Sequence, residues 1–373
     1  MRVHVVDPAA YTPPYDHALC AALARAGAEV TLVTSRFVYG QSPPAEGYER
    51  REPFYLAAFG SPGSRLRTAT KLAEHVPDML RYRRAARAAD VAHFQWLPVQ
   101  HLDGHLLPAH KPLVITAHDV LPREPRPGQL AAQRRLYERF DAIVAHSEHG
   151  RGRLIGEVGV DETRVHVIPH GVLALPRSTA SPSPPTSPSL PPPRDGRPVV
   201  LMFGLLRPYK GLDLLLEAWQ DIEDAELWVV GMARYDIASL QQAAPENVRF
   251  VTRFVGDAEM ASCFDHASLV VLPYREADQS GVAFTALGAG VPMLLSDVGG
   301  FPELAATGAA RTFPAGDAAA LHMALTELLA DPNARAAMSE MARTAAAGPY
   351  SWEKIALQTL GLYGSLLGKG ANR

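Results

Sequence analysis

Residues Val199 to Trp219 read VVLMFGLLRPYKGLDLLLEAW, which is the pattern of a buried strand, a tight loop and a helix. The apolar run ends at Gly204, and Gly211 opens a segment whose leucines recur at helical spacing. Units of this kind build parallel α/β sheets, in which ligands lie beyond the carboxyl ends of the strands. The loop that carries Arg207 and Lys210 is therefore a candidate binding site.

The rest of the chain repeats this pattern of strand, loop and helix on both sides of residues 199–219. Short runs of Val, Ile and Leu alternate with longer segments of helical periodicity, and the runs are continuous, which indicates sheets covered by helices on both faces. We therefore predict an α/β protein with two Rossmann-like, doubly wound parallel-sheet domains. The expected strands are 3–6, 30–33, 91–94, 113–116, 143–145 and 165–168 in the first domain, and 199–203, 227–230, 248–251, 269–272 and 293–295 in the second.

A stretch rich in proline and serine separates the two halves. Residues 176–198 hold nine of the 32 prolines and five serines, a composition that favours extended conformations and offers little to bury. We interpret it as a linker; a recognition site for a proline-binding module is the alternative. The expected domains are 1–173, a linker at 174–198, a nucleotide-sugar-binding domain at 199–349 and a C-terminal helix at 350–373 that packs back on the first domain.

Composition excludes several classes of protein. No apolar run approaches the roughly 20 residues that cross a bilayer. A net charge of -3 gives no general attraction for nucleic acid, so no nucleic-acid partner is expected. Cys20 and Cys263 lie in separate halves, which excludes a disulfide framework and indicates a reducing compartment. Because MRVHVVDPAA lacks the features of an export signal, we expect a cytoplasmic protein.

Two segments of the second half suit a diphosphate. Arg207 offers a planar guanidinium and Lys210 a point charge, both at a strand-to-helix turn. In the segment 270–303, Ser280 is a good N-cap for a helix that begins at Gly281, and the free amides of that helix would face an anion. The alternatives are two solvated cations on an ordinary turn and a plain capped helix whose small residues serve packing.

These two segments, about 70 residues apart, resemble the donor half of the retaining glycosyltransferases of family 4 (glycosyl transferases group 1), which adopt the GT-B fold, with two domains facing a central cleft. The resemblance implies that Gly204, Arg207 and Lys210 bind the diphosphate of a nucleotide sugar. Lys210 and Gly211 match the family pattern directly. The usual arginine after the glycine falls on Leu205, so Arg207 is its substitute.

The family's pair of glutamates falls on Ala277 and Thr285, so the chain resembles a divergent branch. The resemblance then implies that the polar residues 278–281 lie nearest the donor. It also places Glu303, in the turn GGFPE, at another position that recurs in the family. Tyr274 and Phe254 each follow or lie close to a strand end and are candidates to flank the nucleotide base, but for Phe254 core packing is the preferred expectation. The donor-side residues named on this basis, besides those above, are Tyr274, Asp278, Gln279, Ser280, Gly281, Val282 and Glu303.

The first half carries the histidines and the acceptor side. Twelve of the fourteen histidines lie there, but their spacing matches no metal motif, so no metal site and no cofactor are expected. His118 follows the buried run LVITA, and the resemblance implies that it contacts the donor sugar near the reacting carbon; the alternative is a histidine that caps the strand. His170 is expected to be structural or at the edge of the cleft.

The loop after the first strand has prolines where the family carries two glycines. Tyr11, Tyr15, Asp16 and His17 are the expected acceptor contacts there, with an ordinary loop as the alternative. Residues 64–90 hold seven basic and three acidic residues, which favours peripheral contact with anionic lipid at the inner membrane face or, equally, a solvated helix face. Pro77 argues against a single long helix in this segment.

The expected function is transfer of a sugar from a UDP- or GDP-type donor to a hydroxyl acceptor with retention of anomeric configuration. The acceptor is a glycan, a lipid-linked molecule or a small molecule. Arg207, Lys210 and the amides after Ser280 would stabilise the leaving diphosphate as the cleft closes, so that no metal is required. The alternatives are a nucleotide-sugar 2-epimerase, which the missing glutamates argue against, and a catalytically inactive binding subunit.

Overall fold

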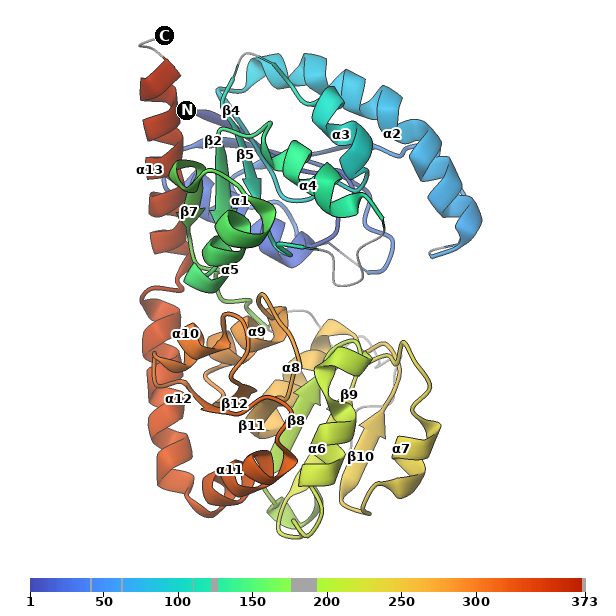
Figure 1. Cartoon of the computed structure of the whole chain (residues 1–373), viewed down its shortest axis with the longest axis vertical. Helices are drawn as coiled ribbons and strands as arrows, with labels where there is room; N and C mark the ends of the chain where they lie inside the picture. The colour runs from blue at the N-terminus through green and yellow to red at the C-terminus, as the bar shows by residue number, and fades with distance from the viewer. Residues whose placement is uncertain (41, 62, 110, 122–126, 176–192, 371–373) are drawn as a thin grey trace. The chain divides into compact units, whose positions relative to one another are not determined.

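The computed structural model describes residues 1–40, 42–61, 63–109, 111–121, 127–175 and 193–370 (Figure 1). The chain forms two compact units. The first unit combines Met1–Gly171 with Ser351–Arg373, and the second unit is Val172–Tyr350. Most of the expected linker, residues 176–192, lies outside the described residues.

A seven-stranded parallel sheet forms the centre of the first unit, in the order β3-β2-β1-β4-β5-β6-β7. Its strands are β1 (Arg2–Asp7), β2 (Glu29–Ser35), β3 (Glu49–Phe54), β4 (Val91–Phe94), β5 (Leu113–Thr116), β6 (Ala142–Ala145) and β7 (Val165–Val167). Its helices are α1 (Pro13–Arg25), α2 (Arg65–Ala85), α3 (Gln100–Leu106), α4 (Gln129–Tyr137), α5 (Glu148–Arg153) and α13 (Trp352–Gly370).

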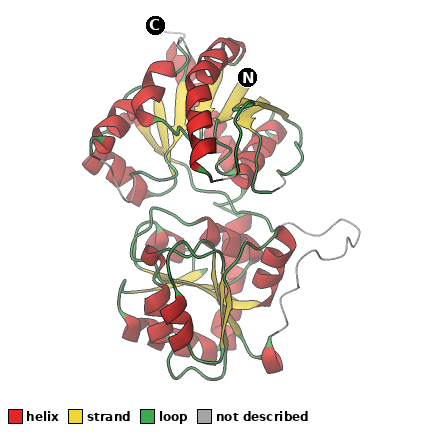
Figure 2. Cartoon of the chain, turned by 90° about the vertical axis from the view of Figure 1, so that its right-hand side faces the viewer, coloured by secondary structure: helices red, strands yellow, loops and turns green. Residues whose placement is uncertain are grey.

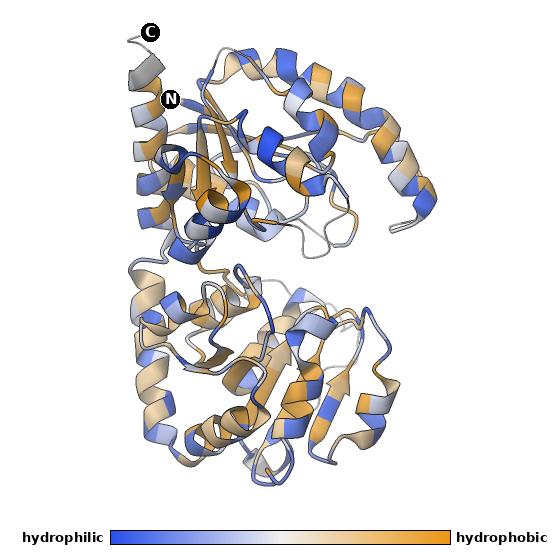
Figure 3. Ribbon diagram, in the orientation of Figure 1, coloured by the Kyte–Doolittle hydropathy of each residue, from blue (hydrophilic) through white to orange (hydrophobic). Residues whose placement is uncertain are grey.

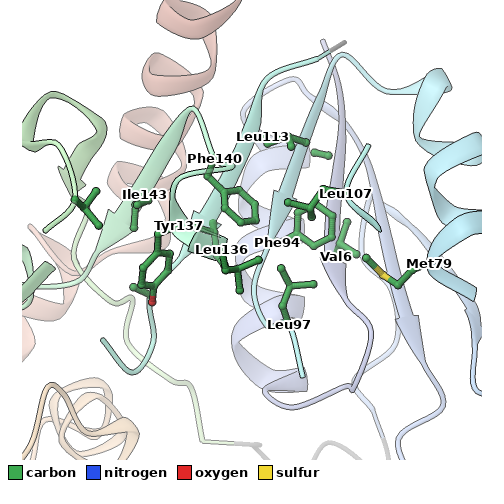
Figure 4. Close-up of a cluster of buried hydrophobic side chains, with 14 of the residues drawn as sticks. Val6, Met79, Phe94, Leu97, Leu107, Leu113, Leu136, Tyr137, Phe140 and Ile143 are labelled. Atoms are coloured by element: carbon green, nitrogen blue, oxygen red, sulfur yellow. The ribbon is translucent and has the colours of Figure 1, made fainter. Parts of the chain in front are cut away.

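Alternate residues of these strands supply two cores, one on each face of the sheet. In β1, Val5 belongs to the core that includes residues of α1 and α13, whereas Val6 packs with Phe94 in the core drawn in Figure 4. Every residue of β4, β5 and β6 is buried. Helices therefore cover both faces of the sheet, as Figure 2 shows.

The second unit is built on a six-stranded parallel sheet in the order β10-β9-β8-β11-β12-β13. Figure 3 shows that the strands of both sheets are mainly hydrophobic, whereas most helices carry both polar and apolar residues. The strands are β8 (Val199–Phe203), β9 (Glu226–Val230), β10 (Val248–Val251), β11 (Ala267–Leu272), β12 (Met293–Ser296) and β13 (Ala310–Phe313). The helices are α6 (Leu212–Ala218), α7 (Ala238–Ala243), α8 (Asp257–His266), α9 (Gly281–Ala289), α10 (Phe301–Ala305), α11 (Ala318–Ala330) and α12 (Pro332–Ala347).

The predicted fold class, two parallel α/β domains, is confirmed, but two strands escaped prediction. β3 reads ERREPF and lies at one edge of its sheet, with only Phe54 buried. β13 reads ARTF and is also an edge strand, with two exposed residues. Edge strands bury fewer side chains and often carry charge, so they lack the continuous apolar run on which the predictions were based.

The expectation that Pro77 would interrupt a long helix is wrong. α2 continues through Pro77 from Arg65 to Ala85, and Figure 1 shows that it bends along its course. A proline removes one helical hydrogen bond and favours a kink. Buried His75, Met79 and Tyr82 hold this part of the helix against the unit.

Among the described helices, none combines the length and the apolar character needed to span a bilayer.

Candidate functional site

The loops that follow β8 and β11 meet at the switch point of the second sheet. These two strands are neighbours, and the strand order runs from them in opposite directions, toward β9 and toward β12. In open α/β sheets, ligands bind at such a point. A backbone hydrogen bond of 2.7 Å joins the two loops, with the amide of Arg275 donating to the carbonyl of Tyr209. The fold therefore places both sequence-predicted segments at one ligand-binding edge.

Lys210 is a buried cation at this edge. Its side chain is 8% exposed, and its Nζ lies 5.1 Å from the centre of the Tyr274 ring. No carboxylate among the described residues forms an ion pair with it. An ammonium removed from water without an acidic partner is costly, and an anionic ligand would offset that cost.

Glycines bring the backbone close to this ammonium. A Cβ on Gly204 would lie 3.1 Å from Lys210 Nζ and 3.2 Å from the side chain of Val282 in the first turn of α9. Gly211 has a φ of 71°, and a Cβ there would lie 2.1 Å from the carbonyl oxygen of Pro273. Only glycine fits at position 211, since any side chain would both strain the backbone and separate the two loops.

Arg275 fixes the same loop from the other side, and the sequence analysis missed it. Its guanidinium forms a bidentate ion pair with Asp213, at 2.6 and 3.0 Å, and donates to the carbonyl of Pro208 at 2.8 Å. The hydrogen bond from Arg275 lowers the pKa of the Asp213 carboxyl. The two residues are 62 positions apart, so no local spacing reveals the pair.

Ser280 occupies the N-cap position of α9, as predicted, but its side chain makes no capping hydrogen bond. Its hydroxyl lies 3.5 Å from that of Tyr274. The first-turn amides of a helix have no partner within the helix, and here the cap side chain does not use them. The amides of Gly281 and Val282 thus lie at the positive end of the α9 dipole, and the Val282 side chain is close to Gly204, the glycine beside Lys210 Nζ.

The turn GGFPE packs against the loop between β11 and α9. Gly299 has a φ of 59°, and a Cβ there would lie 1.4 Å from the carbonyl oxygen of Ala277. The amide of Gly300 donates to the carbonyl of Asp278 at 3.3 Å. Glu303 belongs to the first turn of α10 directly after this contact. The structure therefore joins the backbone near Asp278 to the segment that carries Glu303; Asp278, Gln279 and Glu303 are all partly exposed.

Arg207 begins the short turn that ends at Lys210. Its side chain is exposed and takes part in no ion pair with the described carboxylates. An exposed guanidinium interacts more weakly with a ligand than a buried ammonium, because water screens it. Arg207 is therefore the less constrained of the two predicted phosphate ligands.

The exposure of the two aromatic residues considered for the nucleotide base is the reverse of what was expected. Phe254, expected in the core, is 63% exposed in the loop after β10, so that expectation is wrong. Tyr274 is 2% exposed and packs against Tyr209 and Phe301, with ring centres 5.8 and 5.6 Å away. Its ring supports Lys210 and has no open face for a base.

In the first unit, His118 lies two residues beyond β5 and is 5% exposed. Its Nε2 lies 3.0 Å from Gln95 Oε1 and donates to it, while its ring stacks on Trp96 with centres 4.9 Å apart. Burial, and then neighbouring histidines, lower the pKa of His118 well below its ordinary value. His118 is thus a neutral hydrogen-bonding group at the carboxyl edge of this sheet.

Two further histidines surround Tyr15 at the same edge. His146 lies 5.2 Å from His118 and 5.2 Å from His170, measured between ring centres, and Tyr15 contacts all three. Burial lowers the pKa of His146 to about 4 and that of His170 well below its ordinary value. The lowered pKa values favour neutral imidazoles, which pack against one another and against Tyr15. No group of three metal-ligating side chains occurs in the described part of the chain.

Asp7 shapes the loop after β1, where the family carries glycines. Its carboxylate accepts hydrogen bonds from the amides of Ala9, Tyr11 and Thr12. These bonds hold Ala10 at a φ of 51°, a conformation that normally favours glycine. Burial, and then the charge of Asp7, raise the pKa of Asp16 well above its ordinary value.

The four residues expected to contact the acceptor therefore differ in their exposure. Tyr15 and Asp16 are buried, at 4% and 1% exposure, because α1 turns them toward the sheet, and neither is open to a ligand. His17 hydrogen-bonds to the hydroxyl of Tyr48 at 3.0 Å. Tyr11 is 69% exposed. Trp96, which no motif in the sequence singles out, contacts Tyr11 with ring centres 4.7 Å apart and planes inclined by 35°.

Two family models match this chain. "Glycosyltransferase Family 4" matches residues 15–173, and "Glycosyl transferases group 1" matches residues 197–331. The D-inositol 3-phosphate glycosyltransferase of Xylanimonas cellulosilytica is 27% identical over 92% of this chain and 89% of its own length. A GDP-mannose-dependent monoacylated alpha-(1-6)-phosphatidylinositol monomannoside mannosyltransferase of Corynebacterium glutamicum is 31% identical over 43% of this chain, and the match spans 45% of that enzyme.

Solved structures agree in fold. Sucrose-phosphate synthase from Thermosynechococcus elongatus has a TM-score of 0.75 at 20% identity, covering 99% of this chain and 100% of that chain. Anabaena HepE in complex with UDP and glucose has a TM-score of 0.72 at 19% identity, covering 98% and 100%. One family model covers most of the N-terminal part of the first unit and the other lies within the second unit, and both solved structures cover nearly the whole chain. The chain therefore belongs to the family 4 glycosyltransferases (glycosyl transferases group 1), with the GT-B fold.

Proposed function

We propose that this protein transfers a sugar from a nucleoside diphosphate sugar to a hydroxyl acceptor, with retention of anomeric configuration. The observation that carries the proposal is Lys210, a buried ammonium without a carboxylate partner among the described residues, placed at the switch point of the second sheet. A diphosphate supplies the missing negative charge. The similarity to the GDP-mannose-dependent mannosyltransferase of Corynebacterium glutamicum supports a nucleotide-sugar donor.

In the proposed reaction, the bond between the anomeric carbon and the diphosphate oxygen breaks, and negative charge grows on the diphosphate. Lys210 Nζ and the first-turn amides of α9 stabilise that charge, because both are fixed before the reaction begins. The contacts of Gly211 and Arg275 keep the loop in place. Arg207 adds a second cation, which is exposed to solvent.

We further propose that the transfer reaction needs no divalent metal ion, because the fixed positive groups take the role that a metal ion has in other sugar transferases. It also assigns to His118 a hydrogen bond to the transferred sugar, as the family resemblance implies. A neutral imidazole suits this role, because it can bond to a hydroxyl without adding charge. Phe254, exposed after β10, is the aromatic residue that we assign to the base.

The proposed acceptors include molecules that are attached to lipid. α2 exposes Leu66, Leu72 and Leu80, at 54%, 54% and 41%, beside exposed arginines. Leucines flanked by cations suit the surface of a membrane that contains anionic lipid. Co-sedimentation with anionic and neutral vesicles tests this contact, and replacing Arg83 and Arg84 by glutamate should abolish the preference for anionic vesicles.

The first test of function is a panel of UDP-, GDP- and dTDP-sugars in a thermal-shift assay, since a ligand that binds only the folded chain raises its melting temperature. The donor that binds is then incubated with and without acceptors, with and without a chelator. Transfer that survives chelation supports the proposal. Formation of an epimer without acceptor supports the epimerase, and binding without transfer, hydrolysis or epimer supports an inactive binding subunit.

A further inference from the structure

We propose that α13, the last helix of the first unit, positions His118 for its part in sugar transfer and acts through buried Tyr15. The helix reaches Tyr15 in two ways: Trp352 packs against its ring, and Tyr363 is joined to its hydroxyl by a chain of hydrogen bonds through His93. This inference rests on the proposed function in taking His118 to contact the transferred sugar. The other four are positioning residues, because their effect on the reaction passes through His118, and all five belong to the first unit.

The first turn of α13 lies directly against Tyr15. α13 and α1 contribute to the same core on one face of the first sheet (Figure 1). The indole of Trp352 meets the Tyr15 ring edge-on, with centres 5.1 Å apart and an interplanar angle of 75°. A Cβ on Gly171 would lie 2.3 Å from this indole, so the indole is held closely on that side. Edge-to-face aromatic pairs have a preferred geometry, and a fixed indole therefore also fixes the Tyr15 ring.

A line of buried hydrogen bonds joins Tyr363, about three turns further along α13, to the Tyr15 hydroxyl. The hydroxyl of Tyr363 lies 2.6 Å from His93 Nδ1, and His93 Nε2 lies 2.8 Å from the hydroxyl of Thr116. The side chain of Thr116 is in turn hydrogen-bonded to Tyr15. All four residues are at most 4% exposed, so bulk water does not compete for these bonds.

His93 can pass the orientation of one hydroxyl to the other because its ring is uncharged. Burial, and then the charge of His146, lower the pKa of His93 to about 3. A neutral imidazole donates from one ring nitrogen and accepts at the other, so the orientation of the Tyr363 hydroxyl decides that of the Thr116 hydroxyl. Hydrogen bonds arranged head to tail in this way strengthen one another, so breaking one of them weakens the rest.

Tyr15 connects this chain to His118. The two rings lie nearly at right angles, with centres 4.7 Å apart and an interplanar angle of 86°. Trp96, in the loop after β4, stacks on the same imidazole. The orientation of His118 therefore depends on α13 as well as on the loops around it, although His93 and Tyr363 are 270 positions apart in sequence.

The first test observes the His118 ring directly and needs neither donor nor acceptor. The whole protein is labelled with 13C-histidine, and the ring signal of His118 is assigned by its loss in His118→Gln. We expect this signal to shift in Tyr363→Phe and in Tyr15→Phe, since each removes one hydroxyl of the chain and keeps the ring. Tyr55→Phe is the matched control, because the Tyr55 hydroxyl lies 2.8 Å from His75 Nδ1 and the residue is 7% exposed, but in the core on the other face of the sheet.

The second test measures turnover of the donor identified by thermal shift. Tyr363→Phe should lower kcat by about 10-fold, with little change in the KM for the donor, because a small displacement of a contact near the reacting carbon is costly. Tyr55→Phe should lose a similar amount of thermal stability, since it also removes one buried hydrogen bond, and should keep its kcat. The double variant Tyr15→Phe/Tyr363→Phe should have the kcat of Tyr15→Phe alone, because both hydroxyls belong to one chain.

The inference is overturned if the His118 signal in Tyr363→Phe is that of the wild type, or if Tyr55→Phe shifts it as much. It is also overturned if the losses of kcat in Tyr15→Phe and Tyr363→Phe multiply in the double variant, since the two hydroxyls would then act separately. An unshifted His118 signal in an active transferase counts against the positioning by α13 alone. A shifted signal in a protein that transfers no sugar counts against the proposed function, so the two failures remain distinct.

Discussion

Replacing Lys210 by methionine should separate catalysis from stability. Methionine keeps the length and most of the volume of the side chain and removes its charge. Lys210 is 8% exposed and has no carboxylate partner among the described residues, so its ammonium carries a desolvation cost in the free protein. The variant should therefore melt at the same temperature as the wild type or above it.

Turnover should change in the opposite direction. One fixed contact to charge that develops in a water-poor site is worth ~3 kcal/mol in the transition state, which corresponds to a fall of about 100-fold in kcat. Arg207→Met is the comparison, because that guanidinium is exposed and screened; we expect a loss below about 10-fold. Lys354→Met, at an exposed position of α13, is the control for loss of a lysine and should change neither quantity.

The assay is the release of nucleoside diphosphate from the donor identified by thermal shift, at saturating donor and acceptor, beside a melting curve for each variant. Near-normal kcat in Lys210→Met would refute the assignment of Lys210 to the leaving group. A large fall in melting temperature would refute the premise that the ammonium is uncompensated, because it would reveal a stabilising partner.

Three further predictions follow from the geometry. Gly211→Ala should destabilise the second unit by ~3 kcal/mol, because it combines a φ of 71° with a Cβ 2.1 Å from Pro273 O, and urea denaturation measures this. Gly364→Ala is the control: a Cβ there meets nothing and the residue lies within α13, so stability should be unchanged or raised by up to ~1 kcal/mol. The raised pKa of Asp16 means that its stabilising contribution is complete below the unfolded value of 3.8 and is lost as pH rises through the folded value. Asp16→Asn should remove that part of the pH dependence of unfolding, and an unchanged profile would contradict the raised pKa of Asp16. Phe254→Ala should raise the KM for the donor by about 10-fold with little change in kcat, whereas equal loss in both parameters would place Phe254 elsewhere in the reaction.

The interior of the fold was predictable because parallel strands buried on both faces read as continuous apolar runs. The run from Val199 to Phe203 and its counterparts appear in the structure as β8 and the other central strands. The edge strands β3 and β13 were not predictable in this way, since they bury only one or two residues each. Local periodicity reports burial, and edge strands have little of it.

The candidate site was predictable where its residues are close in sequence. Gly204, Lys210 and Gly211 lie in one strand–loop–helix unit, and Ser280 begins the next one at the switch point. The pair of Arg275 and Asp213 was not predictable, because the two residues meet only through the packing of two loops. The same holds for Trp96, whose partners Tyr11 and His118 come from the ends of two other strands.

The sequence also did not reveal which polar residues are buried. Asp16 stands in the first turn of α1, where an acidic residue ordinarily serves the helix dipole at the surface. Here it is buried beside Asp7, whose charge helps to raise its pKa, an arrangement that depends on how α1 packs on β1. Residue type and position in the helix do not specify that packing.

The central claim is that the ammonium of Lys210 awaits a diphosphate. Isothermal titration of the whole protein with UDP and UMP, and with GDP and GMP, in wild type and Lys210→Met tests it directly. We predict that the preferred diphosphate binds the wild type at least about 10-fold more tightly than its monophosphate, and that Lys210→Met erases this preference. Equal affinity for diphosphate and monophosphate in the wild type, or a preference that survives in Lys210→Met, would contradict the claim.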